Sequence, residues 1–245
     1  MKKALAFLIT LCLGVAAFGD ITLPKLFGDN MVLQRNRTIP VWGWASPGEK
    51  VTVKFNRQVK NAIADKEGNW KVNLDKEMAG GPFTLSVKGN NNITLKNVLV
   101  GEVWICSGQS NMEMPIEGWG KINNYQQEIA AANYPQIRHM KVPNTVAATP
   151  QKDIPSGQWQ VCSPQTAGDF TAAGYFFARE LYNALKVPIG LINSSWGGTH
   201  VETWTSREAF EGSEEFKSMI ATMRVMNLDS MAAARKEATL ARLSS

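Results

Sequence analysis

The sequence of 245 residues has little of several features that define common functional classes. Three cysteines are too few for a disulfide-rich scaffold, and no cluster of His, Cys or Asp has the spacing of a metal site. With 44% apolar and 19% charged residues, the chain is not of the disordered class. No self-similar period is present, which excludes a repeat protein. The sequence therefore indicates a globular chain of one large domain or two modest ones.

Positive charge is too weak and too dispersed to indicate a nucleic-acid partner. The formal net charge is +5, and no basic cluster lies beside stacking aromatic residues. The sequence also lacks a glycine-rich phosphate loop. We therefore expect no nucleic acid, no metal and no organic cofactor, whereas the oligomeric state is left open.

The N-terminus carries the longest apolar run of the chain. Lys2 and Lys3 precede an uncharged stretch at 4–18, and the small residues Ala17 and Gly19 precede Asp20. This arrangement predicts a signal peptide over residues 1–19, because the run is short for a bilayer span. We expect an exported protein, periplasmic or extracellular, without membrane insertion. Removal of the signal peptide would leave two cysteines, Cys106 and Cys162. They form either a disulfide or two buried free thiols, and the sequence does not decide between these alternatives.

Residues 20–100 show the pattern of a β-sandwich domain. Alternation of apolar and polar residues at 51–55 and 83–87, with Pro47-Gly48 as a turn between strands, is typical of short strands. Further strands are expected at 31–34, 39–44, 70–74 and 93–99, giving the seven or eight that a sandwich needs.

From residue 101 the pattern changes to that of an α/β domain, which we expect to cover residues 101–245. Residues 103–106 form a continuous apolar run, which predicts a strand buried on both faces that ends in a polar loop. Alternating elements predict a parallel sheet, incomplete in its strands, with a tail of one long helix or two at 213–243. The expected elements are a helix at 125–132, a strand at 137–142, a helix at 172–185 and a strand at 189–193.

Two loops follow expected parallel strands, where ligands bind in such sheets. In Gly108-Gln109-Ser110-Asn111-Met112 a hydroxyl stands between two amides after a glycine, which favours Ser110 as a nucleophile, although an ordinary polar turn has the same composition. In Trp196-Gly197-Gly198-Thr199 the glycines leave backbone N–H groups open. This loop predicts either a simple turn or an oxyanion hole, to which Gln109 or Asn193 adds a side-chain amide.

Residues 101–115 (GEVWICSGQSNMEMP) and 191–199 (LINSSWGGT) closely resemble the sialate O-acetylesterase family of the SGNH-hydrolase superfamily. Further similarity lies at 27–34, 41–45, 174–181 and 201–204. The resemblance implies an SGNH-type parallel α/β domain and a carbohydrate O-acetylesterase whose partner is an O-acetylated sugar. It implies that Ser110 is the nucleophile and that Gly197 and Gly198 lie in the oxyanion region. Asn111 and Trp196 are candidate substrate-binding residues.

The catalytic histidine is the part of the family pattern that this sequence does not show. The family places it later, typically in an Asp-x-x-His segment, and here no Asp is followed by His three residues on. His139 lies in an expected strand and favours a structural role, whereas His200 follows the glycine loop and is the one alternative base. We therefore expect the N-terminal part of a longer esterase, inactive alone. The alternatives are a non-catalytic carbohydrate-binding or assembly module and an acetylesterase of plant polysaccharide.

Glu113 and Glu117 form a second candidate pair. Paired carboxylates are the signature of glycoside hydrolysis, but a spacing of four residues is equally that of a solvated helix face, which we favour.

Overall fold

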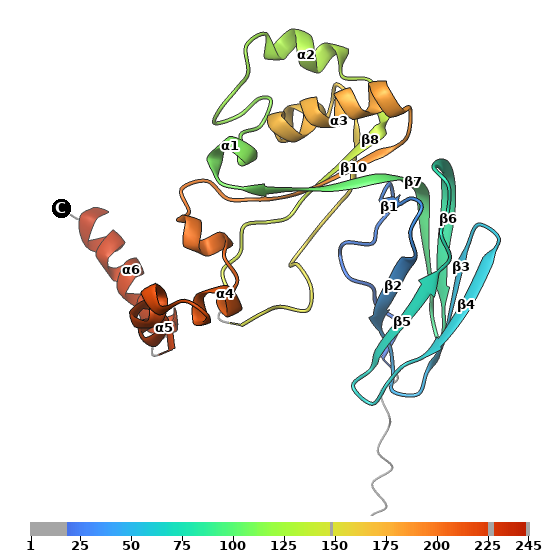
Figure 1. The fold of residues 1–245 in the computed structure, drawn as a ribbon, viewed down its shortest axis with the longest axis horizontal. Helices are drawn as coiled ribbons and strands as arrows, with labels where there is room; N and C mark the ends of the chain where they lie inside the picture. Colours follow the sequence, from blue (N-terminus) through green and yellow to red (C-terminus); the bar gives the residue numbers. More distant parts are fainter. Residues whose placement is uncertain (1–18, 148, 225–227, 244–245) are drawn as a thin grey trace, which may run out of the picture.

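The structure is a computed structural model that describes residues 19–147, 149–224 and 228–243 (Figure 1). The signal peptide expected at residues 1–19 lies outside the described residues, apart from Gly19.

Seven strands make up the first part of the chain, and six of them lie close to the expected positions. β4 is the strand that sequence analysis did not expect; it pairs with β3 through a turn at Asn56, whose φ of 51° lies in the left-handed region that asparagine tolerates. The strands are β1 (Val32–Gln34), β2 (Ile39–Trp44), β3 (Lys50–Phe55), β4 (Gln58–Ile63), β5 (Asn69–Leu74), β6 (Gly80–Lys88) and β7 (Asn92–Gly108).

These strands enclose an apolar core between two layers. β2 and β5 form an antiparallel pair, and β4, β3, β6 and β7 follow one another in a larger sheet on which β1 pairs with β7. Alternate side chains such as Val51, Val53 and Phe55 point into the core because successive residues of a strand face opposite sides.

The expected separate β-sandwich domain is not confirmed. β7 is 17 residues long and pairs first with β6 and then with a strand of the second part, so both parts share one mixed sheet. The boundary expected after residue 100 falls inside this strand.

The second part alternates strands and helices as expected. β10 (Ile189–Ser195) lies between β7 and β8 (Tyr134–Lys141) and is parallel to both, and β9 (Gln160–Cys162) adds an antiparallel edge. The helices are α1 (Ser110–Glu113), α2 (Tyr125–Ala131), α3 (Ala172–Leu185), α4 (Arg207–Glu211), α5 (Lys217–Arg224) and α6 (Leu228–Leu243), and the 3₁₀ turns are η1 (Ala167–Asp169), η2 (Val201–Trp204) and η3 (Glu214–Phe216).

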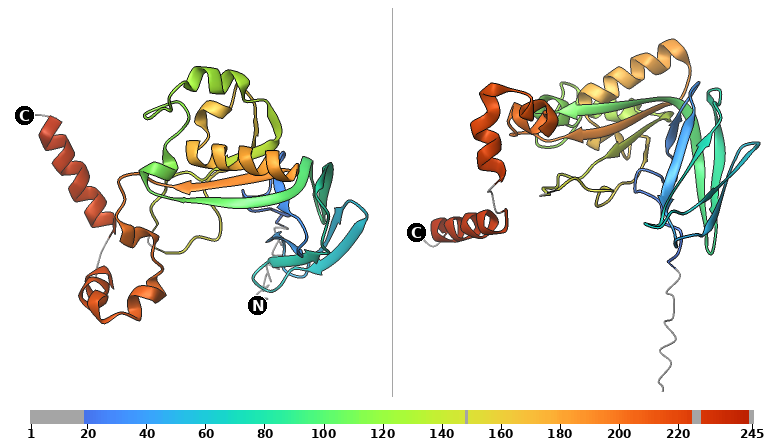
Figure 2. Two further views of the ribbon diagram at one scale, coloured as in Figure 1. Left: turned by 45° about the horizontal axis from the view of Figure 1, so that its top comes forward. Right: turned by 60° about the horizontal axis from the view of Figure 1, so that its bottom comes forward.

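The expectation that residues 103–106 are buried on both faces is wrong. Figure 2 shows α3 along one face of β7 and β10, and on that face Cys106 is buried. Ile105 points to the other face and is 70% exposed, while Trp104 is 43% exposed against Phe177 of α3. Residues 102–108 of β7 pair with β10 on one side only, so among the described residues this stretch is a sheet edge.

A long connection between β8 and β9 ties the two parts together. The backbone N–H of Lys25 donates to Asp153 Oδ1 at 2.9 Å, and Trp159 Nε1 donates to the carbonyl oxygen of Leu26 at 2.8 Å. Trp159 is buried in the core of the first part. The connection therefore fixes the second part against the first.

The chain ends in helices that lie away from the sheet (Figures 1 and 2). α5 and α6 fulfil the expectation of one or two helices at 213–243. Of the helices within the described ranges, none is both long enough and apolar enough to cross a membrane.

Candidate functional site

The two loops singled out in the sequence meet at the carboxyl ends of β7 and β10. Ser195 stands opposite Gly108 in the parallel register, and the N–H of Trp196 donates to the carbonyl oxygen of Gly108 at 2.9 Å. Sheet pairing thus carries residues about 85 positions apart in the chain to one edge, which is where parallel sheets bind ligands.

Ser110 is the first residue of α1 and is exposed. Gly108 precedes it with a φ of 146°, a conformation that glycine adopts without strain, and this turns the chain out of β7. Gly197 packs against the serine so closely that a Cβ on Gly197 would stand 3.2 Å from Ser110 Cβ. The glycine loop therefore lies directly beside the candidate nucleophile.

Glu113 joins the two loops, a role that sequence analysis missed. Its Oε2 accepts the N–H of Gly197 at 2.6 Å, and its Oε1 accepts Nδ2 of Asn144 at 3.0 Å. Lys141 Nζ lies 4.0 Å from the same Oε1. The side chain is only 12% exposed, so the expected solvated position is wrong for Glu113. α1 ends at Glu113, so the four-residue spacing to exposed Glu117 is not that of one helix.

The candidate oxyanion donors differ in whether they already donate a hydrogen bond within the protein. The Gly197 N–H is engaged by Glu113, and Gln109 Nε2 donates to the carbonyl oxygen of Thr199. Asn193 is 1% exposed, and its Oδ1 accepts the hydroxyl of Ser195 beneath the surface. Gly198 is exposed, with a φ of 74° and open space around it. Of the four, Gly198 is the one that is exposed and has no other atom close to it.

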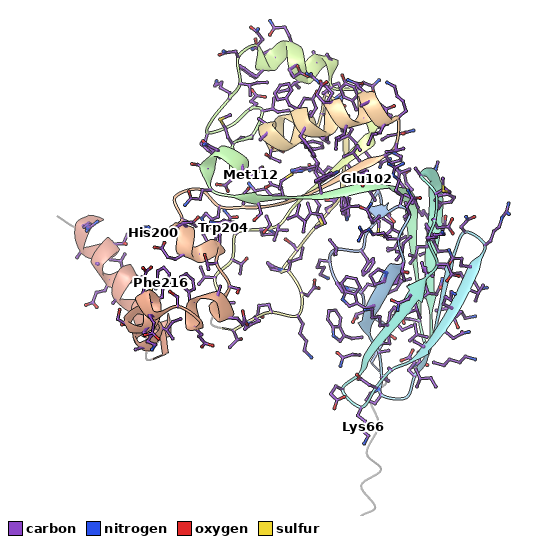
Figure 3. All side chains as sticks on the ribbon, in the orientation of Figure 1. Lys66, Glu102, Met112, His200, Trp204 and Phe216 are labelled. Carbon is purple, nitrogen blue, oxygen red and sulfur yellow. The ribbon has the colours of Figure 1, made fainter. Side chains whose placement is uncertain are left out.

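The candidate substrate-binding residues flank this edge. Asn111 is exposed on α1, and Trp196 is half-buried in the glycine loop. Thr199 Oγ1 donates to the carbonyl oxygen of Trp196 at 2.8 Å and accepts Trp204 Nε1 at 2.9 Å. These two bonds brace the loop from η2 (Figure 3).

The two histidines occupy different environments. His200 precedes η2, is exposed and lies at the same end of the sheet as Met112 of α1 (Figure 3). His139 is 1% exposed in β8 and stacks on Phe170 with ring centroids 4.4 Å apart. Burial lowers the pKa of His139 to about 3, so its ring is neutral near pH 7. Neither ring hydrogen-bonds to Ser110 among the described residues.

Cys106 and Cys162 are unpaired, buried thiols, which decides between the two alternatives left open by the sequence. Burial raises the pKa of both thiols to about 11, so neither is a reactive thiolate at neutral pH. Within the part of the chain that the structure describes, no group of three or more His, Cys, Asp or Glu residues is arranged to hold a metal ion.

Known proteins resemble this chain in sequence and in structure. Residues 100–234 match the family described as "Carbohydrate esterase, sialic acid-specific acetylesterase". Sialate O-acetylesterases of Mus musculus and Homo sapiens are 34% and 35% identical to the chain over 201 and 199 residues, covering 74% and 73% of it. The chain spans 37% of the length of each of these relatives.

A solved structure, a carbohydrate acetylesterase from Xanthomonas citri, superposes with a TM-score of 0.75 at 42% identity. The match covers 80% of this chain and 45% of that one. The mixed sheet with its helices therefore matches part of the fold of a carbohydrate acetylesterase.

Proposed function

Because this chain belongs to the sialic acid-specific acetylesterase family of carbohydrate esterases, we propose that it carries the nucleophile loop of a carbohydrate O-acetylesterase. The observation that carries the proposal is the position of Ser110, which is exposed at the carboxyl edge of the sheet and in contact with the glycine loop. A nucleophile beside backbone donors is the arrangement that acyl transfer requires.

The reaction proceeds in two displacements. Ser110 Oγ bonds to the carbonyl carbon of the acetyl group, and the sugar oxygen leaves with a proton. Water then attacks the acetyl-enzyme, which releases acetate and restores the hydroxyl. The N–H of Gly198 stabilises the negative oxygen of each tetrahedral intermediate, and Asn111 and Trp196 contact the sugar. Glu113 holds the glycine loop against Ser110 and is a positioning residue.

The proton of Ser110 needs a base. His139 is buried and stacks on Phe170, and neither His139 nor His200 makes a hydrogen bond to the serine among the described residues. A serine without a base is a weak nucleophile. We therefore propose that the base is not supplied by these 245 residues as they are arranged, and we expect slow acetate release from them.

Substitution of Ser110 is the direct test. In the natural protein, Ser110→Ala should lower the release of 4-nitrophenol from its acetate ester at least about 10³-fold relative to the unaltered protein. Ser107→Ala is the matched control, because Ser107 is exposed on β7 three residues earlier. Equal turnover by Ser110→Ala and the unaltered protein, with unchanged melting temperature, rules the assignment out.

His200 is tested with the same ester. The 245-residue chain, its Ser110→Ala variant and its His200→Ala variant should give three equally feeble rates between pH 5 and pH 9. Strong turnover by the chain that both variants lose shows instead that His200 is the base.

A glycan-binding module without turnover is the second candidate, and one observation favours it: no histidine ring hydrogen-bonds to Ser110 in the described residues. Binding of an acetylated sugar without acetate release by the natural protein would select it.

Export is proposed from residues 1–19 alone, on the basis of Lys2 and Lys3 before the apolar run. N-terminal sequencing of the protein recovered from outside the cytoplasm should begin near Asp20.

A further inference from the structure

A polar pocket adjoins the segment that follows the Ser110 helix. It has a volume of about 600 Å³ and is bounded by segment 115–119, which starts five residues after Ser110, and by segment 156–160. The lining residues that matter here come from four elements of the second part and are Glu117, Trp119, His139, Lys141, Gln160 and Asp169.

His139 is the residue that points to a ligand. It lines the pocket, it is 1% exposed, and neither of its ring nitrogens has a hydrogen-bond partner among the described residues. A buried polar group without a partner costs free energy, so such groups are rare unless something binds them. A neutral imidazole offers one N–H donor and one acceptor nitrogen, which matches the mixed donor and acceptor character of a hydroxyl group.

The rest of the lining suits a sugar ring. Trp119 stands at the pocket with 66% of its surface exposed, and a flat indole face packs against the apolar C–H face of a pyranose ring. Gln160 supplies an amide, and Glu117 and Asp169 supply carboxylate acceptors for hydroxyl donors. An aromatic surface with a few polar groups around it is the usual composition of a small-molecule pocket.

The charges in the lining select among sugars. Glu117 and Asp169 are negative, and the one cation, Lys141, has its Nζ 4.0 Å from the carboxylate of Glu113. An anionic sugar entering this pocket meets two carboxylates and a lysine that is already partly neutralised, which is unfavourable. An uncharged ring does not incur this repulsion.

We propose that the pocket lined by Trp119, His139 and Asp169 binds an uncharged sugar ring of a glycan. Glu113 links the pocket to the nucleophile, since it contacts Lys141 on one side and holds Gly197 beside Ser110 on the other. The assignment of this pocket as the sugar subsite of the esterase rests on the proposed function, whereas binding itself does not.

The test is calorimetric titration of the 245-residue protein with xylotriose and, separately, with N-acetylneuraminic acid. Xylotriose should bind at least tenfold more tightly than the acid. Trp119→Ala and His139→Phe should each weaken xylotriose binding at least tenfold, and Trp104→Ala, a tryptophan that packs on α3 outside the pocket, should not change it. Asp169→Asn is a second test, because Asp169 is exposed and its substitution does not disturb the core. This variant should bind xylotriose more weakly and N-acetylneuraminic acid more tightly.

Three results overturn the proposal: xylotriose does not bind, its binding is unaffected by Trp119→Ala and Asp169→Asn, or the acid binds more tightly than xylotriose. Ser110→Ala separates it from the proposed function. That variant should bind xylotriose normally, and if it also keeps the full turnover of the natural protein, the nucleophile assignment fails while the sugar pocket stands.

Discussion

The two halves of the molecule differ in what they bury. The core around β3, β5 and β6 is built from apolar side chains, whereas every buried Arg, His, Thr, Asn or Ser of the described residues belongs to the second half. These buried polar residues are Arg138, His139, Thr171, Asn193 and Ser195. The half with the polar interior is also the half that carries Ser110, the glycine loop and the pocket proposed to bind a sugar.

The same contrast appears within a single strand. Residues 98–100 of β7 have β6 and β1 as partners and are almost fully buried, whereas residues 102–108 have β10 on one side only. Ile105 is correspondingly exposed. The apolar character of a strand segment therefore does not decide its burial; the presence of neighbours does.

The largest expected effect comes from a charge in the doubly paired segment. Val98→Asp places a carboxylate in an apolar core with no partner and should cost more than about 4 kcal/mol of unfolding free energy, enough to unfold the protein. Ile105→Asp on the open segment should change stability by less than about 0.5 kcal/mol. Urea unfolding followed by circular dichroism measures both, and similar losses at the two positions would remove the contrast.

Acid is expected to have an intermediate effect on stability, through His139 in the second half. The unfolded chain protonates His139 near its ordinary pKa of 6.5, but the folded protein does so only near pH 3. Between these values the unfolded state binds more protons, so stability present above pH 6.5 is lost as the pH falls. The loss attributable to this group is roughly 2 to 3 kcal/mol between pH 6.5 and pH 4.5.

His139→Leu should flatten this part of the stability curve, measured by urea titrations at several pH values. Other groups also titrate in this range. The curve of unfolding free energy against pH for the variant is therefore compared with the curve for the unaltered protein, and a completely flat curve is not expected. Parallel curves for the variant and the unaltered protein would show that His139 is not the source of the acid sensitivity.

The smallest expected effect concerns the contact between the two loops. Glu113→Ala removes the acceptor of the Gly197 N–H and should cost roughly 1 to 2 kcal/mol, because a hydrogen bond to a charged group is lost at a partly exposed site. Amide hydrogen exchange at residues 196–199 should accelerate, while exchange in β3 and β5 stays unchanged. Glu117→Ala is the control, since Glu117 is exposed and takes no part in this contact.

Local elements were predictable because their signals are local. The helix expected at 172–185 coincides with α3, where Thr171 caps the N-terminus by accepting the N–H of Gly174. The helix at 125–132 and the strand at 189–193 were correct within two residues. The strand at 103–106 was placed correctly, but its burial on both faces was wrong. A run of four apolar residues does not reveal that α3 covers only one face of the strand.

The candidate site was predictable in part. The composition of the two loops singled out Ser110 and the glycines, but it gave no sign that Glu113 occupies the Gly197 N–H or that Asn193 faces inward, since strand register and side-chain direction set both. His139 was rightly placed in a strand, and nothing in the residues around it indicated a pocket.

By itself the sequence indicated most of the strands, the longer helices and the family to which the chain belongs, because these depend on residues that are near one another in the chain. The tertiary structure decided that β7 serves both halves, that residues 108 and 195 stand opposite one another, and that Trp119, His139 and Asp169 line one pocket. These are contacts between distant segments, and they exist only once strand pairing and helix packing have brought those segments together.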